Sequence, residues 1–511
     1  MKTKLTRLIA LMLVIVTLTL TFASCADTSG GEETTAQVSV STTAAADGTE
    51  APVDTTPQTD EWGRPYVEAP TAEGTKLEDG TVITMLLRDS DTWNREYHSE
   101  SENGDMLNDE IYKRNLQLQE ELNFTFEFIK SPSKEDSQRT IIAEFESGGS
   151  SGLDIVSNYA YYSTAPALRD CYVNLHTLDT LNLDNPWWND TYVEAATIKD
   201  QLYFVVGDLN LSVVDRSLAI YYNATMANDL QIGNLYDTVL NGEWTIEKFL
   251  EYTRDTWVDN NQSGSIDLPD KIGVISIAGS EAYDGFLSAF GVDIIGKTSD
   301  GNLELIWDTE RVSNAIDQQI ALFSNNNGAF LHSNHAELCN KFTNGEALFW
   351  IYTIYASSST NQSLRSMNDT YGLIPLPKYD LDQQNYYTTV QDAYNIMSVM
   401  STSSHLSAVG TVLVEWSYRS YCDILPVYCE VIMKTRYLVD VESGMIFDLI
   451  LDSIKFDTGM IYGSELESIG TSTRSIVKSG TNTFSSTYKI KQRAYNNRLK
   501  QLVKDFEERI K

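Results

Sequence analysis

Between residues 81 and 157 the sequence alternates strand-like and helix-like segments, and this alternation limits the possible fold more than any other feature. Its segments are the apolar run TVITMLL (81–87), a helix with Leu107, Ile111, Leu118 and Leu122 on one face, the alternating NFTFEFIK (123–130), a helix over 138–146, and the apolar run LDIVS (153–157). A β-α-β-α-β order predicts a parallel sheet with helices on its faces.

The same kinds of segment continue through the rest of the 511 residues, which are enough for two α/β lobes. The further predicted strands are LYFVV (202–206), SLAIYYN (217–223), KIGVISI (271–277), ALFWIY (347–352), YGLIPLP (371–377) and AYNIMSV (393–399). A final helix has Tyr495, Leu499, Leu502, Phe506 and Ile510 in one stripe.

The N-terminus has the layout of a secretory signal. Lys2, Lys4 and Arg7 precede the apolar run 8–21, which is too short and too rich in threonine to favour a spanning helix. The four residues FASC, which end at Cys25, resemble the lipobox of bacterial lipoproteins, although Phe stands where Leu is usual. We therefore expect a signal peptide over 1–24 and acylation of Cys25, with an ordinary cleaved signal or an uncleaved anchor helix as alternatives.

The residues after Cys25 predict a disordered tether over 25–75. They are mainly Thr, Ala, Ser, Gly, Asp and Glu, and the first aromatic residue is Trp62. Such a segment buries too little apolar surface to offset the entropy of ordering.

Charge and cysteine usage restrict the partners and the kind of scaffold. The formal net charge is -35, which argues against nucleic acid and against lying on an anionic membrane surface. Beyond Cys25 the chain has Cys171, Cys339, Cys422 and Cys429, too few for a disulfide scaffold. Whether Cys422 pairs with Cys429 stays open.

Three motifs match catalytic patterns by letters only. GVDIIGKT (291–298) has the spacing of a phosphate loop but follows a helix-like segment, and GGSSG (148–152) lies between a helix and a strand, in the reverse order of a nucleophile elbow. His332 and His335 have no third ligand at a suitable spacing. We therefore expect no enzyme, although pairs of carboxylates among 72 acidic residues stay possible.

The segment DNNQSGSIDLPD (259–270) resembles a calcium loop. Gly264 takes the sixth position, where the turn is sharpest, and Thr245 is a plausible N-cap of the helix that enters the loop. The following segment is a strand, so the loop would be isolated and structural, and an Asx-rich turn without metal is the alternative. The expected Ca²⁺ ligands are Asp259, Asn261, Ser263, Ser265, Asp267 and Asp270.

Four motifs in order resemble the extracellular solute-binding proteins of family 1, the maltose-binding-protein-like receptors of ABC importers. They are LDIVSNYAYYSTAPALRDCYVNLHTLD, the segment from NPWWNDTYV to AIYYNATM, GEWTIEKFLEYTRD, and FTNGEALFWIY followed by YGLIPLPKYD. The resemblance covers the chain from about residue 80 to the C-terminus.

The resemblance implies a two-lobed periplasmic-binding-protein-like fold of type II, with parallel-rich sheets and crossing hinge strands. The first lobe would comprise 76–210 and 373–418, and the second 211–372 and 419–511. A monomer anchored at the outer face of the bacterial cytoplasmic membrane would capture a small polar solute, such as a sugar or oligosaccharide, for permease subunits. No cofactor is required. A surface carbohydrate-active enzyme, or a scaffold lipoprotein without a permease, is the alternative.

In open α/β sheets, ligands bind beyond the carboxyl ends of the strands. Aromatic faces there can pack on sugar C–H groups, while Asp and Asn accept or donate hydroxyl hydrogen bonds. The expected solute contacts are Trp93, Tyr159, Tyr161, Asp208, Asn210, Tyr283, Asp284, Trp350, Tyr352, Asp392 and Tyr394.

Overall fold

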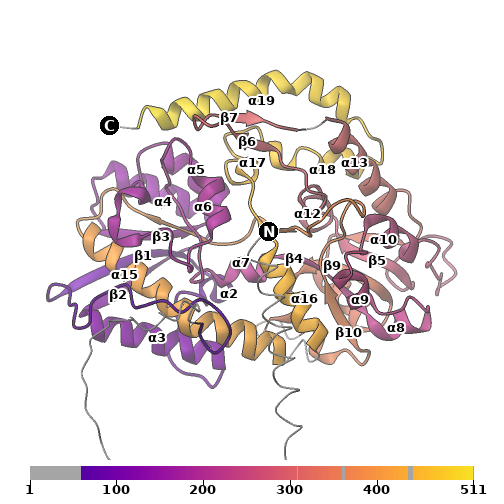
Figure 1. Cartoon of the computed structure of the whole chain (residues 1–511), viewed down its shortest axis with the longest axis horizontal. Coiled ribbons are helices and arrows are strands. Elements are labelled where there is room, and N and C mark those ends of the chain that lie inside the picture. The colour runs from indigo at the N-terminus through magenta and orange to yellow at the C-terminus, as the bar shows by residue number, and fades with distance from the viewer. Residues whose placement is uncertain (1–58, 308, 359–362, 436–440, 510–511) are drawn as a thin grey trace, which may run out of the picture. The chain divides into compact units, whose positions relative to one another are not determined.

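The computed structural model describes residues 59–307, 309–358, 363–435 and 441–509. The expected signal peptide and Cys25 lie outside these residues. The described chain forms two lobes, each built around its own sheet (Figure 1). We call the lobe that contains strand β1 the first lobe and the lobe that contains strand β4 the second lobe. Four of the seven strand pairs in the two larger sheets are parallel, which confirms the predicted α/β class.

The first lobe has a four-stranded sheet in the order β12-β3-β1-β2. Strand β1 pairs in parallel with β2 and with β3, as the alternation in the sequence predicts, and β12 returns from far along the chain to pair antiparallel with β3. Its main elements are β1 (Thr81–Arg88), α3 (Met106–Leu122), β2 (Phe124–Ser131), α4 (Lys134–Glu146), β3 (Leu153–Asn158), α5 (Ala160–Ala167), β12 (Ile396–Val399) and α15 (Leu406–Arg419).

The second lobe has a five-stranded sheet in the order β10-β4-β9-β5-β8. Strands β9, β5 and β8 are parallel, whereas β4 pairs antiparallel with both β9 and β10. Its main elements are β4 (Leu218–Asn223), α8 (Ala224–Asp229), α9 (Leu235–Leu240), α10 (Ile246–Thr253), β5 (Ile272–Ile277), α12 (Gly285–Ala289), α13 (Thr309–Phe323), β8 (Ala329–His332), α14 (His335–Thr343), β9 (Ala347–Thr353), β10 (Tyr371–Ile374) and α16 (Val441–Asp452).

One long helix and several short elements connect or cover the lobes. Helix α19 (Phe484–Glu507) begins against the second lobe, where Phe484 packs on Trp307, and ends against the first lobe, where Phe506 packs on Tyr203. Figure 1 shows it crossing above both sheets. The short elements include α2 (Asp91–Asn94), α6 (Asp190–Ala196), α7 (Leu211–Arg216), β6 (Ile295–Lys297), β7 (Leu303–Leu305), β11 (Thr388–Thr389), β13 (Ile454–Lys455), α17 (Thr458–Ile461) and α18 (Arg474–Ser479).

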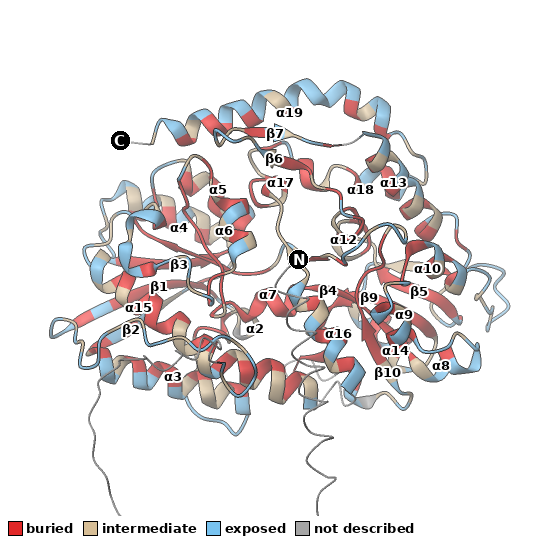
Figure 2. Ribbon diagram, in the orientation of Figure 1, coloured by how far each residue is buried: buried red, intermediate tan, exposed pale blue. Residues whose placement is uncertain are grey.

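Local sequence chemistry sets the helix starts. The side chain of Asp105 accepts a hydrogen bond from the backbone N–H of Asn108 and caps α3, and Ser133 caps α4 in the same way. Thr245 caps α10, as predicted from the sequence. The central strands are buried on both faces, so they appear as red ribbons inside each lobe in Figure 2. This burial explains why they appear in the sequence as continuous apolar runs.

Three expectations from the sequence are wrong. Residues 202–206 are buried but do not form a strand, because only Val205 pairs, in an isolated antiparallel bridge with Met397 of strand β12. Strand β10 belongs to the second sheet, so the chain does not return to the first sheet at residue 373 but only at β12. Part of the expected tether is bound to the first lobe, since Arg64 donates to the carbonyl of Tyr421 at 2.5 Å and its guanidinium lies 4.3 Å from the tyrosine ring.

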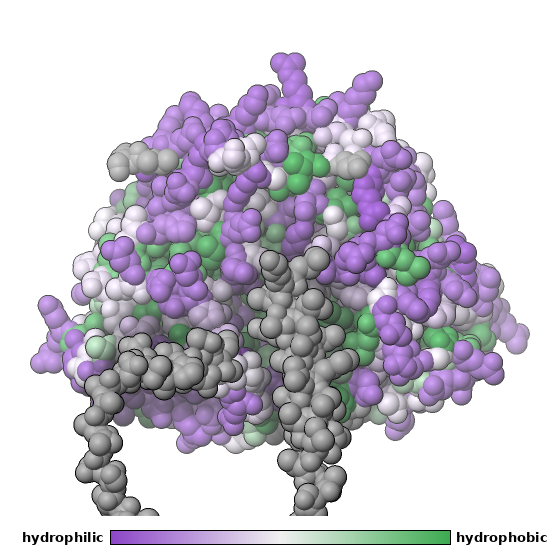
Figure 3. All heavy atoms as spheres, in the orientation of Figure 1, coloured by the Kyte–Doolittle hydropathy of each residue, from purple (hydrophilic) through white to green (hydrophobic). Residues whose placement is uncertain are grey.

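The face of the molecule in Figure 3 is mainly hydrophilic, with small scattered apolar areas. All four cysteines in the described ranges are free thiols, so Cys422 and Cys429 do not pair. Within the same ranges, no helix combines the length and the apolar character needed to cross a bilayer.

Candidate functional site

Aromatic rings and guanidinium groups meet where strands of the first sheet end. Strand β1 ends at Arg88, whose guanidinium lies 4.2 Å from the ring centre of Trp93 and 4.0 Å from that of Tyr159. Trp93 and Tyr159 are themselves in edge-to-face contact at 6.0 Å. The structure therefore brings together two of the predicted contact residues at the carboxyl ends of β1 and β3.

Arg216 extends this group to the second lobe. Its guanidinium lies 4.0 Å from the ring centre of Trp93 and 4.7 Å from that of Tyr355, which follows strand β9. Distances of this size are typical of cation–π contacts. We call the residues Arg88, Trp93, Tyr159, Arg216 and Tyr355 the interlobe cluster, because it joins residues at the ends of strands from both sheets.

The predicted residue Tyr352 lies beside this cluster. It is largely buried in β9, and its ring lies 4.4 Å from that of His335. Burial raises the pKa of Tyr352 to about 12, against the opposing positive charge of Arg216. Its hydroxyl is therefore protonated at neutral pH.

A cavity next to the interlobe cluster contains four more of the predicted residues. Tyr161 from the first lobe and Asp284 from the second line it, together with Asp392 and Tyr394 from the segment that returns between the lobes. Residues of the segments 287–294, 389–390, 455–463 and 468–471 form most of its remaining walls. We call it the interlobe cavity. Tyr161 is 45 % exposed, which leaves ring surface available to a solute.

The carboxyl groups of the interlobe cavity are already engaged within the protein. Asp284 accepts from Nε of Arg474 at 2.5 Å, and burial raises the pKa of its carboxyl to about 6 in spite of that cation. Asp293 pairs with Lys455, and Asp457 accepts from the backbone N–H of Ile294 at 2.9 Å. Asp392 is exposed and lies 3.9 Å from Arg474.

Three predicted contact residues have structural roles instead. Trp350 has no exposed surface and stacks on Tyr352 with ring centres 4.9 Å apart, so our expectation that it contacts a solute is wrong for this arrangement. Tyr283 is buried and packs edge-on against Phe323. The amide of Asn210 donates to the hydroxyl of Tyr97 at 2.7 Å and to the carbonyl of Asn395 at 3.1 Å, which leaves it no free donor. A strand-end position in the sequence does not reveal whether a side chain points to the cleft or to the core.

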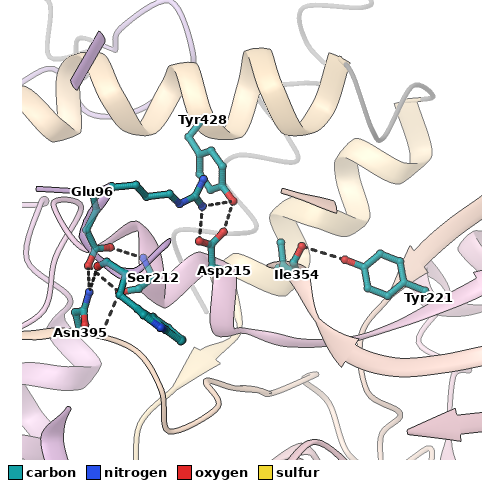
Figure 4. A network of polar contacts seen from close by, with 9 residues as sticks. Glu96, Ser212, Asp215, Tyr221, Ile354, Asn395 and Tyr428 are labelled. Atoms are coloured by element: carbon teal, nitrogen blue, oxygen red, sulfur yellow. Dashed lines mark hydrogen bonds and ion pairs between the residues drawn. The ribbon is translucent and has the colours of Figure 1, made fainter. Parts of the chain in front are cut away.

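The buried carboxylate of Glu96 binds the segments in which the chain crosses between the lobes. Glu96 accepts hydrogen bonds from the backbone N–H of Ser212 at 2.6 Å, from its hydroxyl at 3.0 Å, and from the amide of Asn395 at 2.5 Å. Figure 4 shows Glu96 between these two side chains, and close by it shows Asp215 facing the hydroxyl of Tyr428. Burial raises the pKa of Glu96 to about 7, although these donors favour its ionised form.

Sequence reasoning missed Arg88, Arg216 and Tyr355. Arg88 ends the predicted first strand, so the rule that ligands bind at carboxyl ends applied to it, but it was not singled out. Arg216 lies in α7, before a strand, and nothing in the sequence marks its position.

The predicted calcium loop is a compact turn in this structure. The carboxylate of Asp259 accepts from the backbone N–H of Gly264 at 2.8 Å, and the amide of Asn261 donates to Asp267 at 2.9 Å. Asp270 is buried and accepts from the indole N–H of Trp257 at 2.8 Å. In the described part of the chain no group of three or more His, Cys, Asp or Glu residues is arranged to hold a metal ion.

Asp208, another predicted contact, lies away from the interlobe cluster. It lines a separate groove with Asp184, Trp188 and Leu451. Burial raises the pKa of Asp208 to about 7, partly offset by the positive charge of Arg64.

No protein-family model and no curated protein matches the sequence. Solved structures share the fold. A cyclo/maltodextrin-binding protein complexed with maltotetraose aligns with a TM-score of 0.52 and 12% identity, covering 85% of this chain and 98% of the other. An ABC transporter solute-binding protein from Thermotoga lettingae bound with α-D-tagatose gives 0.54 and 13%, covering 82% and 100%. A sugar transporter protein from Rhizobium etli in an open conformation gives 0.51 and 14%, covering 84% and 100%. The likeness confirms the predicted two-lobed binding-protein fold.

The raised pKa of Asp208 generates a stability prediction. Its ordinary pKa is 3.8, so between about pH 4 and pH 7 the folded state holds a proton that the unfolded state has lost, and stability falls as the pH rises through this window. Asp208→Asn should therefore raise the free energy of unfolding by about 1–3 kcal/mol at pH 8 and have little effect at pH 4. Thermal unfolding at both pH values measures this. Asp184→Asn, an exposed residue of the same groove, is the control and should change neither. An equal change in the free energy of unfolding for Asp208→Asn at both pH values would contradict the raised pKa of Asp208.

Proposed function

We propose that this chain is an extracellular receptor that binds a sugar or oligosaccharide between its two lobes and delivers it to an ABC importer. The observation that carries the proposal is the convergence of aromatic and polar side chains from both lobes. Trp93 and Tyr159 come from the first lobe and Tyr355 from the second, while Tyr161 and Asp392 line the adjoining cavity. Aromatic faces suit the C–H surfaces of sugars, and carboxylates suit their hydroxyl groups.

A solute that binds between the lobes changes the balance between their open and closed arrangements. A solute that contacts both the ring of Trp93 and residues of the second lobe favours the closed arrangement, because only that arrangement offers it both sets of contacts. The permease would then recognise the closed form. The named structures of the same fold have maltotetraose and tagatose as ligands, which agrees with this proposal.

A receptor accounts for the cavity better than a carbohydrate-active enzyme. Glycoside cleavage needs one protonated and one ionised carboxyl group, both free to face the substrate. Here the carboxylates of Asp284, Asp293 and Asp457 are held by cations or by backbone N–H groups, so none of the three is free to face a substrate.

We further propose that the receptor is a monomer held at the outer face of the cytoplasmic membrane by a lipid on Cys25. The lipobox-like residues before Cys25 support the anchor. Residues 60–71 lie against the first lobe, which makes the tether shorter than the sequence suggests.

The receptor proposal predicts binding with closure and without turnover. Adding the correct sugar should raise the melting temperature and compact the protein in small-angle scattering. Tyr161→Ala should weaken binding by about 1–2 kcal/mol, roughly tenfold, because the exposed ring in the cavity is lost. Calorimetric titration measures this. The matched control is Tyr66→Ala, which removes an exposed tyrosine outside the interlobe cavity and should leave the affinity unchanged. Recovery of cleaved sugar after long incubation would refute the receptor proposal.

We also propose that the loop 259–270 binds structural Ca²⁺. The carboxylates of Asp259 and Asp267 lie in an exposed loop and can turn from their present hydrogen bonds to an ion. The double variant Asp259→Ala, Asp267→Ala should lower the melting temperature in millimolar Ca²⁺ and not in chelator. Asp270 is kept because its bond to Trp257 stabilises the fold without metal. Equal shifts in both solutions would mean a turn without metal.

The proposed lipid anchor on Cys25 predicts the effect of replacing this residue. Cys25→Ala should abolish lipid labelling and release the protein from the membrane fraction into the medium, since a lipid on this thiol is what would hold it there. Continued membrane association of the variant would indicate an uncleaved anchor helix instead.

A further inference from the structure

Arg216 is a buried charge without a counter-ion. The residue is only 8 % exposed, and its guanidinium is in contact with the rings of Trp93 and Tyr355. Its Nε atom is buried and donates to no acceptor, and no carboxylate of the described residues forms an ion pair with it. Burying a cation in this way is costly, and cation–π contacts of about 0.5–2 kcal/mol each offset only part of that cost.

The carboxylates around Arg216 are engaged elsewhere. Asp215, its neighbour in the sequence, pairs with Arg95 and accepts from the hydroxyl of Tyr428. Asp284 is bound to Arg474, and Asp392 accepts from the amide of Gln391 at 2.9 Å. Glu281 accepts from the hydroxyl of Ser280 at 3.0 Å. None of them neutralises Arg216 through a direct contact.

A second guanidinium adds to the positive charge. Arg88 lies 4.2 Å from the ring centre of Trp93, so this single indole is in contact with both arginines. Arg88 donates a hydrogen bond to the neutral amide oxygen of Asn395. The nearby Glu96 is occupied by Ser212 and Asn395. Two like charges are thus held close together around one ring.

Further donors without acceptors lie beside Tyr352. The Nε2 atom of His335 and the indole N–H of Trp350 are both buried and without a hydrogen-bond partner. The rings of both residues contact the ring of Tyr352, at 4.4 Å and 4.9 Å between centres. Burial, and then the positive charge of Arg216, lower the pKa of His335, so its imidazole is neutral at pH 7 and offers one N–H.

We propose that the solute is an acidic saccharide, and that its carboxylate binds Arg216 with His335 as a second donor. A carboxylate accepts two parallel hydrogen bonds from a guanidinium, which matches a buried arginine whose Nε is free. The faces of Trp93 and Tyr159 then remain for the sugar rings. This inference rests on the proposed receptor function and specifies the class of its solute.

The experiment compares acidic sugars with their neutral parents. Calorimetric titrations into the full-length protein compare galacturonate with galactose, glucuronate with glucose, and the disaccharide of galacturonate with galactobiose. A further titration with galactose 1-phosphate tests a phosphate in place of the carboxylate. We expect at least one uronate to bind at least about 30-fold more tightly than its neutral parent. Its affinity should fall as the salt concentration rises.

Variants locate the binding group. Arg216→Gln should weaken uronate binding about 30-fold or more and change binding of neutral sugars far less, whereas Arg216→Lys should restore part of the loss. Arg169→Gln removes an exposed arginine outside the site and is the control for net charge. If Arg216→Gln does not fold, the wild-type preference and its salt dependence still decide the question.

The outcomes separate the inference from the function on which it rests. Compaction with a neutral sugar and no preference for any uronate would overturn the acidic-saccharide inference and leave the receptor function intact. Tight binding of galactose 1-phosphate alone would also overturn it, because the anion would then be a phosphate. A failure of every sugar, acidic and neutral, to bind or to compact the protein would overturn both.

Discussion

The arrangement of the two lobes depends on one buried carboxylate. Glu96 follows the first strand, and its two oxygens accept hydrogen bonds from Ser212 on the outgoing crossover and from Asn395 on the returning one. Three segments far apart in the sequence are thus joined at one group. A charge so deeply buried is tolerated because these donors replace the water that it loses. The competition between burial and these donors is why its pKa rises only to about 7.

The candidate site is built directly on this junction. Trp93 lies three residues before Glu96, and its carbonyl accepts from the amide of Asn395 at 2.7 Å. Asn395 also bonds Arg88, so the residue that fixes the crossover fixes one side of the interlobe cluster as well. Arg216 ends the short helix α7, which begins at the crossover. A change in the angle between the lobes therefore has to alter the contacts of Trp93, and the receptor proposal uses this link between the candidate site and the crossover.

Much of the fold could be predicted because the buried faces of helices and strands produce a regular spacing of apolar residues in the sequence. Strands β1 and β3 are apolar runs, α3 has its leucines on one face, and the β-α-β order implies parallel pairing. This spacing predicts the wrong element where a segment is buried without belonging to a helix or a sheet. Residues 202–206 are as apolar as a central strand, but they are buried by packing and pair only at Val205.

The sequence by itself determined the α/β class, the strand ends at which polar and aromatic residues gather, and the caps of the helices, because these follow from local periodicity and from side chains within a few residues. Only the tertiary structure decided which strand-end residues face the cleft. It turned Trp350 into the core and left Tyr161 exposed. It also placed Arg216 against Trp93 across the junction of the lobes. Side-chain direction at a strand end depends on which neighbour packs there, and whether a charge has a partner depends on residues that are distant in sequence. Neither property can therefore be predicted from the amino-acid sequence alone.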